Sequence, residues 1–343
     1  MRNSAVSGTD DLGTTLRLVA KRLPPTWRLE TPPKASVVSL RAPDGTVARL
    51  TVLRRRKLEP KDVQTLQSSS QQGLKGTLVT AGFLSPRTRQ LLREAGASYA
   101  DASGNMRVVA DRPGIFVEAE GAQKNPGREP RPLASLKGPA AARVVRALCD
   151  FRPPYGVRKL AEIAETAPAS ASRVVSLLER EALIERGPRD EIREVDWAGL
   201  LQRWIQDYQF LSSNDVTAFL DPRGLPSFPA KLRNLKARAV VTGSLAAVRR
   251  APVASPRLAA VYVDDPEAAA KSLVLRPADS GGNVTLVRPL DPVVFARSWV
   301  DEGIKYAALS QVAADLLTSP GRGPSEGEEL IAWMKKNTDA WRA

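Results

Sequence analysis

Short hydroxyl side chains and one arginine share a face of a helical segment in the middle of this 343-residue chain. Between residues 169 and 182, Val174, Leu177 and Leu178 recur at helical spacing. The opposite, polar side carries Ser170, Ser172, Arg173 and Ser176. Short hydroxyls let a helix approach DNA closely, and an arginine beside them can reach a guanine edge or a phosphate. This face is therefore a candidate DNA-reading surface, with a solvated helix face as the alternative.

Basic side chains flank this segment on both sides. Arg158 and Lys159 open the preceding helical segment, where they would lie beside a DNA backbone, and Arg186 and Arg189 lie at a turn that follows. The turn would place its arginines on a phosphate or in the minor groove. Five acidic residues also lie close by and must face away from phosphate: Glu179, Glu181, Glu185, Asp190 and Glu191.

The densest basic run of the chain lies much earlier. Directly after the apolar stretch 47–53 come Arg54, Arg55, Arg56 and Lys57. Such a run is either a loop that contacts phosphates or the solvated end of a strand.

The middle of the chain reads as three helices followed by a hairpin. Helical patterns cover residues 140–151, 157–164 and 169–182, and short extended runs at 183–186 and 191–195 enclose a turn. The stretch VRKLAEIAETAPASASRVVSLLEREALIER resembles the winged helix-turn-helix family of small bacterial regulators. The resemblance implies DNA binding through the third helix, although winged helices also serve as protein–protein modules.

The positive charge of the chain is concentrated in its first 193 residues. The formal net charge is +14, with 51 basic and 37 acidic residues. Residues 1–136 carry 22 basic and 12 acidic groups, residues 137–193 carry 11 and 8, and residues 194–343 carry 18 and 17. A polyanionic partner such as double-stranded DNA would therefore meet the first two segments.

Two residue types that support much of enzyme chemistry are missing or scarce. The chain has no histidine, which excludes Ser-His-Asp and Cys-His catalysis and histidine zinc sites. Its single cysteine, Cys149, excludes a disulfide within the chain and lies in an apolar helical pattern typical of a buried residue. Residues 1–16 lack an apolar signal core and no segment is long enough to span a membrane, so we expect a cytoplasmic, nucleoid-associated protein.

The first segment shows strand and helix patterns. Residues 37–53 read as a hairpin around Pro43-Asp44-Gly45, and Ser85 precedes a helix that runs to residue 95. Two strands are expected in GASYADASGNMRVVADRPGIFVEAEG, and this arrangement resembles the PD-(D/E)XK nuclease-like superfamily. There, carboxylates hold magnesium and a lysine assists the attacking water.

The nuclease resemblance implies specific residues. Asp101 would be the first acid and Glu118 the second, but Glu120 stands where the superfamily has its lysine. A carboxylate cannot supply that positive charge, so we expect a degenerate domain that does not cut DNA. Asp101 also suits an Asx-type turn before Gly104.

The last segment mixes strand and helix patterns. Trp197–Leu211 is amphipathic, strands are expected near 239–242, 257–265 and 283–287, and helical patterns cover 291–299 and 307–317. The Gly243-Ser244 pair followed by Asp264 and Asp265 resembles nucleotidyltransferases, in which such residues cradle a triphosphate and hold magnesium. Adjacent acids point to opposite sides of a strand, which departs from the family's Asp-x-Asp spacing.

A second family resemblance covers most of residues 138–336. VVTGSLAA, VRPLDPVVF and the ending QVAADLLTSPGRGPSEGEELIAWM resemble the AbiEi-type antitoxin-like regulators of type IV toxin–antitoxin systems. The resemblance implies a DNA-binding, autoregulatory protein beside a partner toxin. The basic N-terminal segment is not a required part of such an antitoxin.

Together these observations predict an α/β multi-domain protein. We expect a degenerate nuclease-like α/β domain at 1–124, a linker at 125–136, a winged helix-turn-helix at 137–195, and at 196–343 an α/β domain of nucleotidyltransferase-like fold that binds a partner or self-associates. The expected function is double-stranded DNA binding in transcription regulation, with no cofactor. The alternatives are a magnesium-dependent nuclease or nucleotidyltransferase, and a protein–protein adaptor.

Overall fold

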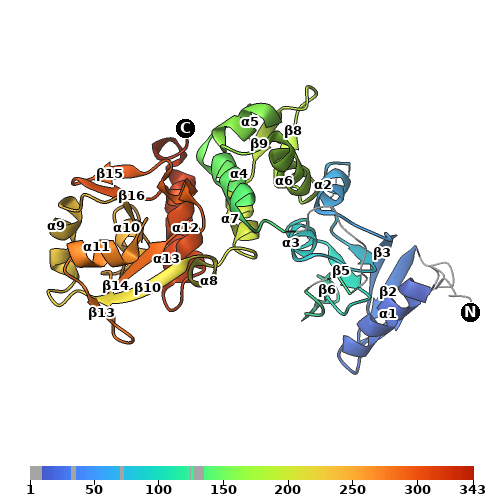
Figure 1. Cartoon of the computed structure of the whole chain (residues 1–343). Coiled ribbons are helices and arrows are strands. Elements are labelled where there is room, and N and C mark those ends of the chain that lie inside the picture. The colour runs from blue at the N-terminus through green and yellow to red at the C-terminus, as the bar shows by residue number, and fades with distance from the viewer. Residues whose placement is uncertain (1–9, 32–35, 70–72, 124, 127–134) are drawn as a thin grey trace, which may run out of the picture. The chain divides into compact units, whose positions relative to one another are not determined.

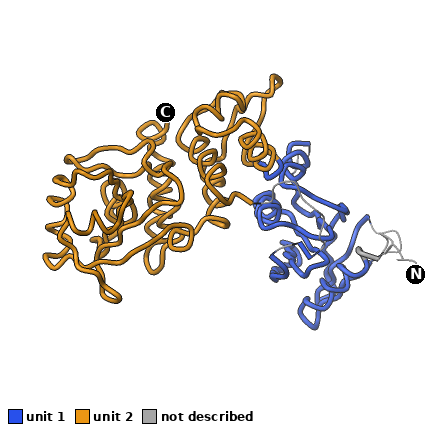
Figure 2. Tube along the Cα trace, in the orientation of Figure 1, with its two compact units in different colours: residues 1–131, 180–182 blue, residues 132–179, 183–343 orange. Residues whose placement is uncertain are grey.

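The computed structural model describes residues 10–31, 36–69, 73–123, 125–126 and 135–343. The chain forms two compact units, one of residues 1–131 with 180–182 and the other of residues 132–179 with 183–343 (Figure 2). Most of the expected linker, residues 127–134, lies outside the described residues. No helix in the described part of the chain is long and apolar enough to cross a membrane.

The N-terminal unit is built on one seven-stranded mixed sheet. Its strands lie side by side in chain order, and β3, β4 and β5 run parallel while the other neighbours are antiparallel. The strands are β1 (Arg28–Glu30), β2 (Val37–Arg41), β3 (Val47–Arg54), β4 (Thr77–Ala81), β5 (Ser98–Asp101), β6 (Met106–Ala110) and β7 (Ile115–Ala119). The expected hairpin at 37–53 is confirmed as β2 and β3.

Helices cover both faces of this sheet. They are α1 (Asp10–Arg22), α2 (Pro60–Ser68) and α3 (Pro86–Glu94). Along β4, Leu78 packs in the core with α1, whereas its neighbour Val79 packs in the core with α2 and α3. Because successive side chains of a strand point to opposite faces, α1 lies on one face and α2 with α3 on the other. The hydroxyl of Ser85 accepts from the backbone N–H of Thr88 at 3.1 Å and caps α3, as expected.

The second unit begins with three helices and a short antiparallel hairpin (Figure 1). These elements are α4 (Pro139–Asp150), α5 (Val157–Ile163), α6 (Pro168–Arg180), β8 (Ile184–Arg186) and β9 (Ile192–Val195). Their order and bounds confirm the helices and strands expected from the sequence. A backbone bridge between Tyr155 and Ile192 adds the α4–α5 connection to the hairpin.

A second seven-stranded mixed sheet forms the rest of this unit. Its order is β13-β10-β14-β12-β11-β16-β15. The strands are β10 (Asp215–Leu220), β11 (Ala239–Thr242), β12 (Ala259–Val263), β13 (Arg276–Pro277), β14 (Val284–Arg288), β15 (Trp299–Asp301) and β16 (Ile304–Tyr306). All five residues of β12 are buried, so both faces of the sheet are covered at its centre. The helical pattern at 291–299 is only partly confirmed, because a 3-10 helix η2 (Pro292–Phe295) is followed by β15.

Helices surround this second sheet. They are α7 (Trp197–Trp204), α8 (Phe210–Ser213), η1 (Leu225–Ser227), α9 (Phe228–Arg233), α10 (Ser244–Ala247), α11 (Pro266–Ser272), α12 (Leu309–Leu317), α13 (Gly323–Lys336) and η3 (Thr338–Ala340). Helices α12 and α13 lie side by side (Figure 1). The amphipathic stretch 197–211 is divided between α7 and α8.

The three helices and the second sheet share one apolar core. Helix α4 packs against α7 and α12, and the rings of Trp197 and Trp341 meet edge to face at 4.9 Å. The Arg342 guanidinium donates to the carbonyl oxygens of Leu148, Cys149 and Phe151 at 2.8–3.1 Å. The end of the chain therefore closes the C-terminus of α4, where four carbonyl groups lack helical partners.

Candidate nucleic-acid interface

Helix α6 has one buried and one exposed side. Its buried residues are Ala171, Val174, Val175, Leu177 and Leu178. On the other side Ser172 and Arg173 are exposed, and Ser170 and Ser176 are half-buried. The Arg173 guanidinium donates through Nε to the carbonyl of Ala169 at 3.2 Å and through Nη2 to Ser170 Oγ at 3.4 Å. The four candidate residues thus share the face that the sequence predicts, with Arg173 directed toward the N-terminus of α6.

The first turn of α5 carries the next two candidates. Arg158 and Lys159 are exposed, and Lys159 Nζ lies 3.2 Å from the Glu162 carboxylate. Both side chains of this pair are about two-thirds exposed, so the pair contributes little to stability. Arg158 forms no ion pair with any residue that the structure describes.

The hairpin turn separates its two arginines into different environments. Arg186 is only 16% exposed and pairs with Asp190 and, at 3.5 Å, with Glu179 of α6. It therefore holds the hairpin against α6. Arg189 lies exposed at the tip, and its backbone N–H donates to the Glu191 carboxylate at 2.9 Å. Of the two, Arg189 is the one presented to solvent.

Three of the five acidic residues near α6 form ion pairs with arginines of the β8–β9 hairpin. Glu179 and Asp190 pair with Arg186, and Glu191 pairs with Arg193 at 2.7 Å. A hydrogen bond from its own backbone N–H, then one from Arg193, lowers the pKa of the Glu191 carboxyl. The local repulsion of a phosphate is thereby reduced.

The basic run of the N-terminal unit lies where β3 ends. Residues 54–57 are all exposed. The Arg55 backbone N–H donates to Thr80 at 2.9 Å, and its guanidinium donates to the Arg54 carbonyl at 3.0 Å. Lys57 pairs with Glu59 at 2.7 Å. The backbone of the run is therefore held by β4, and its side chains remain at the surface.

Asp101, the first nuclease candidate, is buried at the end of β5 and occupied by hydrogen bonds. Its carboxylate accepts from the backbone N–H groups of Leu84, Ser103 and Asn105 at 2.9–3.0 Å. The Ser103 hydroxyl and the Asn105 amide donate to it at 2.7 and 2.9 Å. The bond to Ser103 N–H two residues ahead is the Asx-type turn expected from the sequence.

The two other acids of that set have their own partners. Glu118 of β7 pairs with Arg93, and Glu120 accepts from Gln123 at 3.4 Å. Among the described residues, no group of three or more histidine, cysteine, aspartate or glutamate side chains is arranged to hold a metal ion. Asp101 is therefore built into the fold as the acceptor that closes the β5–β6 turn.

Gly121 lies against this turn, so a substitution there tests how closely the turn is packed. A Cβ at Gly121 would lie 2.6 Å from the Gly104 carbonyl carbon and 2.7 Å from the Asn105 nitrogen. We expect Gly121→Ala to destabilise the N-terminal unit by about 1–3 kcal/mol, because backbone must move to admit the methyl group. Hydrogen exchange of residues 98–119 should be faster in this variant.

Gly13 provides the matched control for that substitution. It lies in α1, and nothing stands within 4 Å of a Cβ placed there. Gly13→Ala should stabilise α1 by about 0.5–1 kcal/mol, since alanine favours a helix over glycine. Equal exchange rates in the wild-type protein and Gly121→Ala would contradict the close packing at this turn.

The candidate nucleotide-binding residues lie at the end of β11 and beyond β12. Gly243 has φ +66° and precedes α10, and the Ser244 hydroxyl donates to the buried Glu326 carboxylate. Asp264 is exposed, and its neighbour Asp265 caps α11 by accepting from Glu267 and Ala268. Ser244 is thus directed toward α13, and of the two adjacent aspartates Asp265 is engaged as the cap of α11.

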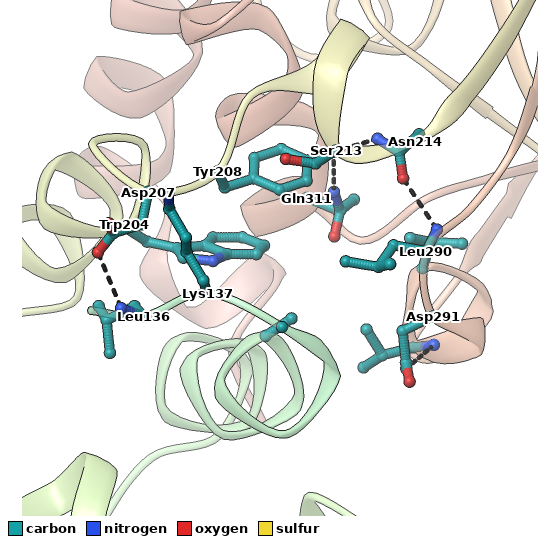
Figure 3. A pocket seen from close by; sticks show the side chains of 14 residues that line it. Leu136, Lys137, Trp204, Asp207, Tyr208, Ser213, Asn214, Leu290, Asp291 and Gln311 are labelled. Atoms are coloured by element: carbon teal, nitrogen blue, oxygen red, sulfur yellow. Dashed lines mark hydrogen bonds between the residues drawn. The ribbon is translucent and has the colours of Figure 1, made fainter. Parts of the chain in front are cut away.

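A small cavity at the junction of α4, α7 and α12 contains polar groups that the sequence did not indicate. Trp204, Tyr208, Asn214 and Gln311 line it (Figure 3), with a volume of about 30 Å³. Gln311 donates to the Tyr208 hydroxyl at 3.3 Å. This volume has room for about one water molecule, so the cavity is a feature of the packing.

A buried polar network lies beside this cavity. The Asp315 carboxylate accepts from Tyr208 at 2.7 Å, Thr242 at 2.6 Å and Tyr262 at 2.9 Å. Burial raises the pKa of Asp315 to about 6, although the hydrogen bonds it accepts act in the opposite direction. The residues of this network come from four segments that are distant in the sequence, so no local pattern indicated it.

One comparison with known proteins identifies a family match. Residues 193–332 match the family of transcriptional regulators described as AbiEi antitoxins of type IV toxin–antitoxin systems. The matched region begins at β9 and covers the second sheet through most of α13. No curated protein and no solved structure has a significant match to the chain.

Proposed function

We propose that this protein is a transcriptional regulator of the antitoxin type that binds double-stranded DNA through a winged helix-turn-helix at residues 137–195. The observation that carries the proposal is the polar side of α6, where Ser172 and Arg173 are exposed and the opposite side is buried in the shared core. Helix α6 has 13 residues and is about 20 Å long, a suitable length for the major groove. The family match at 193–332 supports the regulatory role.

In this proposal each basic residue has a defined role. Arg173 reads a guanine edge from the major groove, while Ser172 and its neighbouring hydroxyls contact bases or phosphates at close range. Arg158 and Lys159 contact the backbone at the start of α5, and Arg189 at the hairpin tip contacts a phosphate or the minor groove. Arg186, paired with two acids, positions the hairpin without contacting DNA itself.

The remaining segments add affinity and a partner surface. The exposed run 54–57 supplies further phosphate contacts from the N-terminal unit. The nearly neutral residues 194–343 supply the surface for a partner protein or a second copy of the chain. Residues 1–124, as a degenerate nuclease-like domain that does not cut DNA, serve as a scaffold or as a second DNA-contacting surface.

Fluorescence anisotropy with duplex DNA tests the proposal. A binding site is first selected from a random duplex library, and affinity is then compared with an unrelated duplex at 100 mM salt. Arg173→Ala should reduce the preference for the selected site by about 10–100-fold, because a guanine contact is lost. Arg55→Ala should weaken both duplexes alike and lower the salt slope by about 1.

Arg152→Ala is the matched control for this experiment. Arg152 is an exposed arginine of the same unit that pairs with Asp339, and it lies outside the proposed interface. We expect its affinities to stay within twofold of the wild-type protein. Absence of duplex binding at 100 mM salt, or an Arg173→Ala variant with unchanged preference, would contradict the proposal.

A further inference from the structure

A pocket of about 460 Å³ opens beside the start of β11. Residues of α9 and β16, two elements that contact each other (Figure 1), help to line it. Its apolar wall includes Leu232, Leu235, Val240 and Ile304. Gly243 and Ser244 lie at the other end of β11, so this pocket is separate from the candidate nucleotide-binding residues. Its volume is in the range that small-molecule ligands occupy.

The charged residues that line this pocket all have the same sign. They are Arg233, Lys236, Arg238 and Lys305, and no carboxylate lines it with them. This is unusual for residues 194–343, where 18 basic residues are balanced by 17 acidic ones. The nearby acids Asp301 and Glu302 both pair with Arg249 instead. Four cations gathered without a carboxylate produce a local positive potential.

The cations of the pocket are positioned and largely uncompensated. The Arg238 guanidinium stacks on the Phe295 ring with its central carbon 3.8 Å from the ring centroid, which fixes the plane of its donors. Lys236 and Lys305 form no ion pair with any residue in the described part of the chain. Among the residues that the structure describes, the Arg233 guanidinium donates only to the carbonyl of Glu302, at 3.3 Å.

We propose that this pocket binds a free phosphorylated small molecule whose phosphate is held by Arg238, Lys236 and Lys305. A planar guanidinium gives paired hydrogen bonds to a phosphate, and the two lysines add point charges. The apolar wall accommodates a non-polar part of the ligand. A recessed site with such a wall suits a small molecule better than the backbone of duplex DNA, which needs an exposed surface. This inference goes beyond the proposed DNA binding and does not depend on it.

Isothermal titration calorimetry of the full chain without DNA tests this site. Pyrophosphate and ADP are titrated at 150 mM NaCl into the wild-type protein and into the double variant Lys236→Gln/Lys305→Gln. Binding should be at least tenfold weaker in the double variant, because two charge-assisted contacts are lost. Unchanged circular dichroism of the variant confirms that it is folded.

A second double variant removes the same charge elsewhere. Lys271 and Lys336 are exposed at the ends of α11 and α13 and do not line the pocket. Lys271→Gln/Lys336→Gln should bind pyrophosphate within twofold of the wild-type protein. Equal weakening in both double variants, or no measurable binding of either probe, would overturn the proposal.

A measurement of DNA affinity distinguishes the phosphate of a free small molecule from the phosphates of the DNA backbone. The affinity for a 20-base-pair duplex should stay within twofold in Lys236→Gln/Lys305→Gln. If duplex affinity falls as much as pyrophosphate affinity, the pocket contacts DNA and the free-ligand proposal is wrong. If the wild-type protein binds pyrophosphate but no duplex DNA, the proposed function is wrong and the pocket proposal stands.

Discussion

Arg146→Ala should lower the free energy of unfolding of the unit that contains α4 by about 3–5 kcal/mol, because it leaves a buried carboxylate without its cation. Arg146 is 1% exposed, and its guanidinium pairs with Asp150 at 2.9 Å. It also donates to Gln311 at 3.0 Å, Val293 at 3.4 Å and Ala296 at 3.1 Å. These contacts join α4 to η2 and α12.

The size of this effect follows from what remains after the substitution. Asp150 is 3% exposed and would keep only the Ser310 hydroxyl as a side-chain donor. The Ala296 carbonyl and the Gln311 amide oxygen would lose this donor as well, whereas the Val293 carbonyl would keep the backbone N–H of Ala296. An unpaired buried charge costs several kcal/mol, while each lost neutral acceptor adds about 1–3 kcal/mol at most.

Urea denaturation followed by tryptophan emission measures this prediction. Five of the six tryptophans lie at or after Trp197, so the emission reports chiefly on this unit. Arg152→Ala is the control, because its pair with Asp339 is 40% and 94% exposed and contributes about 1 kcal/mol or less. If Arg146→Ala lowers the free energy of unfolding no more than Arg152→Ala does, the buried pair does not hold α4 to the sheet.

Local patterns allowed much of the fold to be predicted from the sequence. The spacing of Val174, Leu177 and Leu178 predicts α6 because burial follows the helical period within one segment. The capped start of α3 and the β2–β3 hairpin are equally local. The pattern at 291–299 is only partly helical: four residues form η2, and pairing with β16 then makes Trp299–Asp301 a strand. The partner residues of this hairpin, Ile304–Tyr306, lie outside the segment that carries the helical pattern.

The candidate site shows a similar division. Arg158 and Arg173 are exposed because each lies on the polar side of an amphipathic helix, α5 and α6 respectively. This amphipathic pattern can be recognised in the sequence. The different environments of Arg186 and Arg189 depend on Glu179 lying across from the hairpin. The pocket at β11 joins segments separated by about 70 residues, and the phosphate-binding arrangement proposed there has no sequence spacing that would indicate it.

The stability of the second unit should also depend on pH through Asp315. This carboxyl is fully buried, and burial raises its pKa to about 6 from a model-peptide value of 3.8. Between these two pH values the folded state therefore binds more protons than the unfolded state. Its contribution to stability is fully present below pH 3.8 and is lost as the pH rises to 6, by about 3 kcal/mol in total.

Asp315→Asn removes this titration and retains a side chain of the same shape. The difference in unfolding free energy between the variant and the wild-type protein should shift by about 2.4 kcal/mol in favour of the variant from pH 4 to pH 7. Asp339→Asn, at a carboxylate that is 94% exposed, should leave the wild-type pH dependence unchanged. Because the wild-type protein and Asp315→Asn share every carboxylate except Asp315, the difference between them isolates Asp315. A difference that does not vary with pH would mean that Asp315 is already ionised near pH 4, with its four hydrogen-bond donors outweighing its burial.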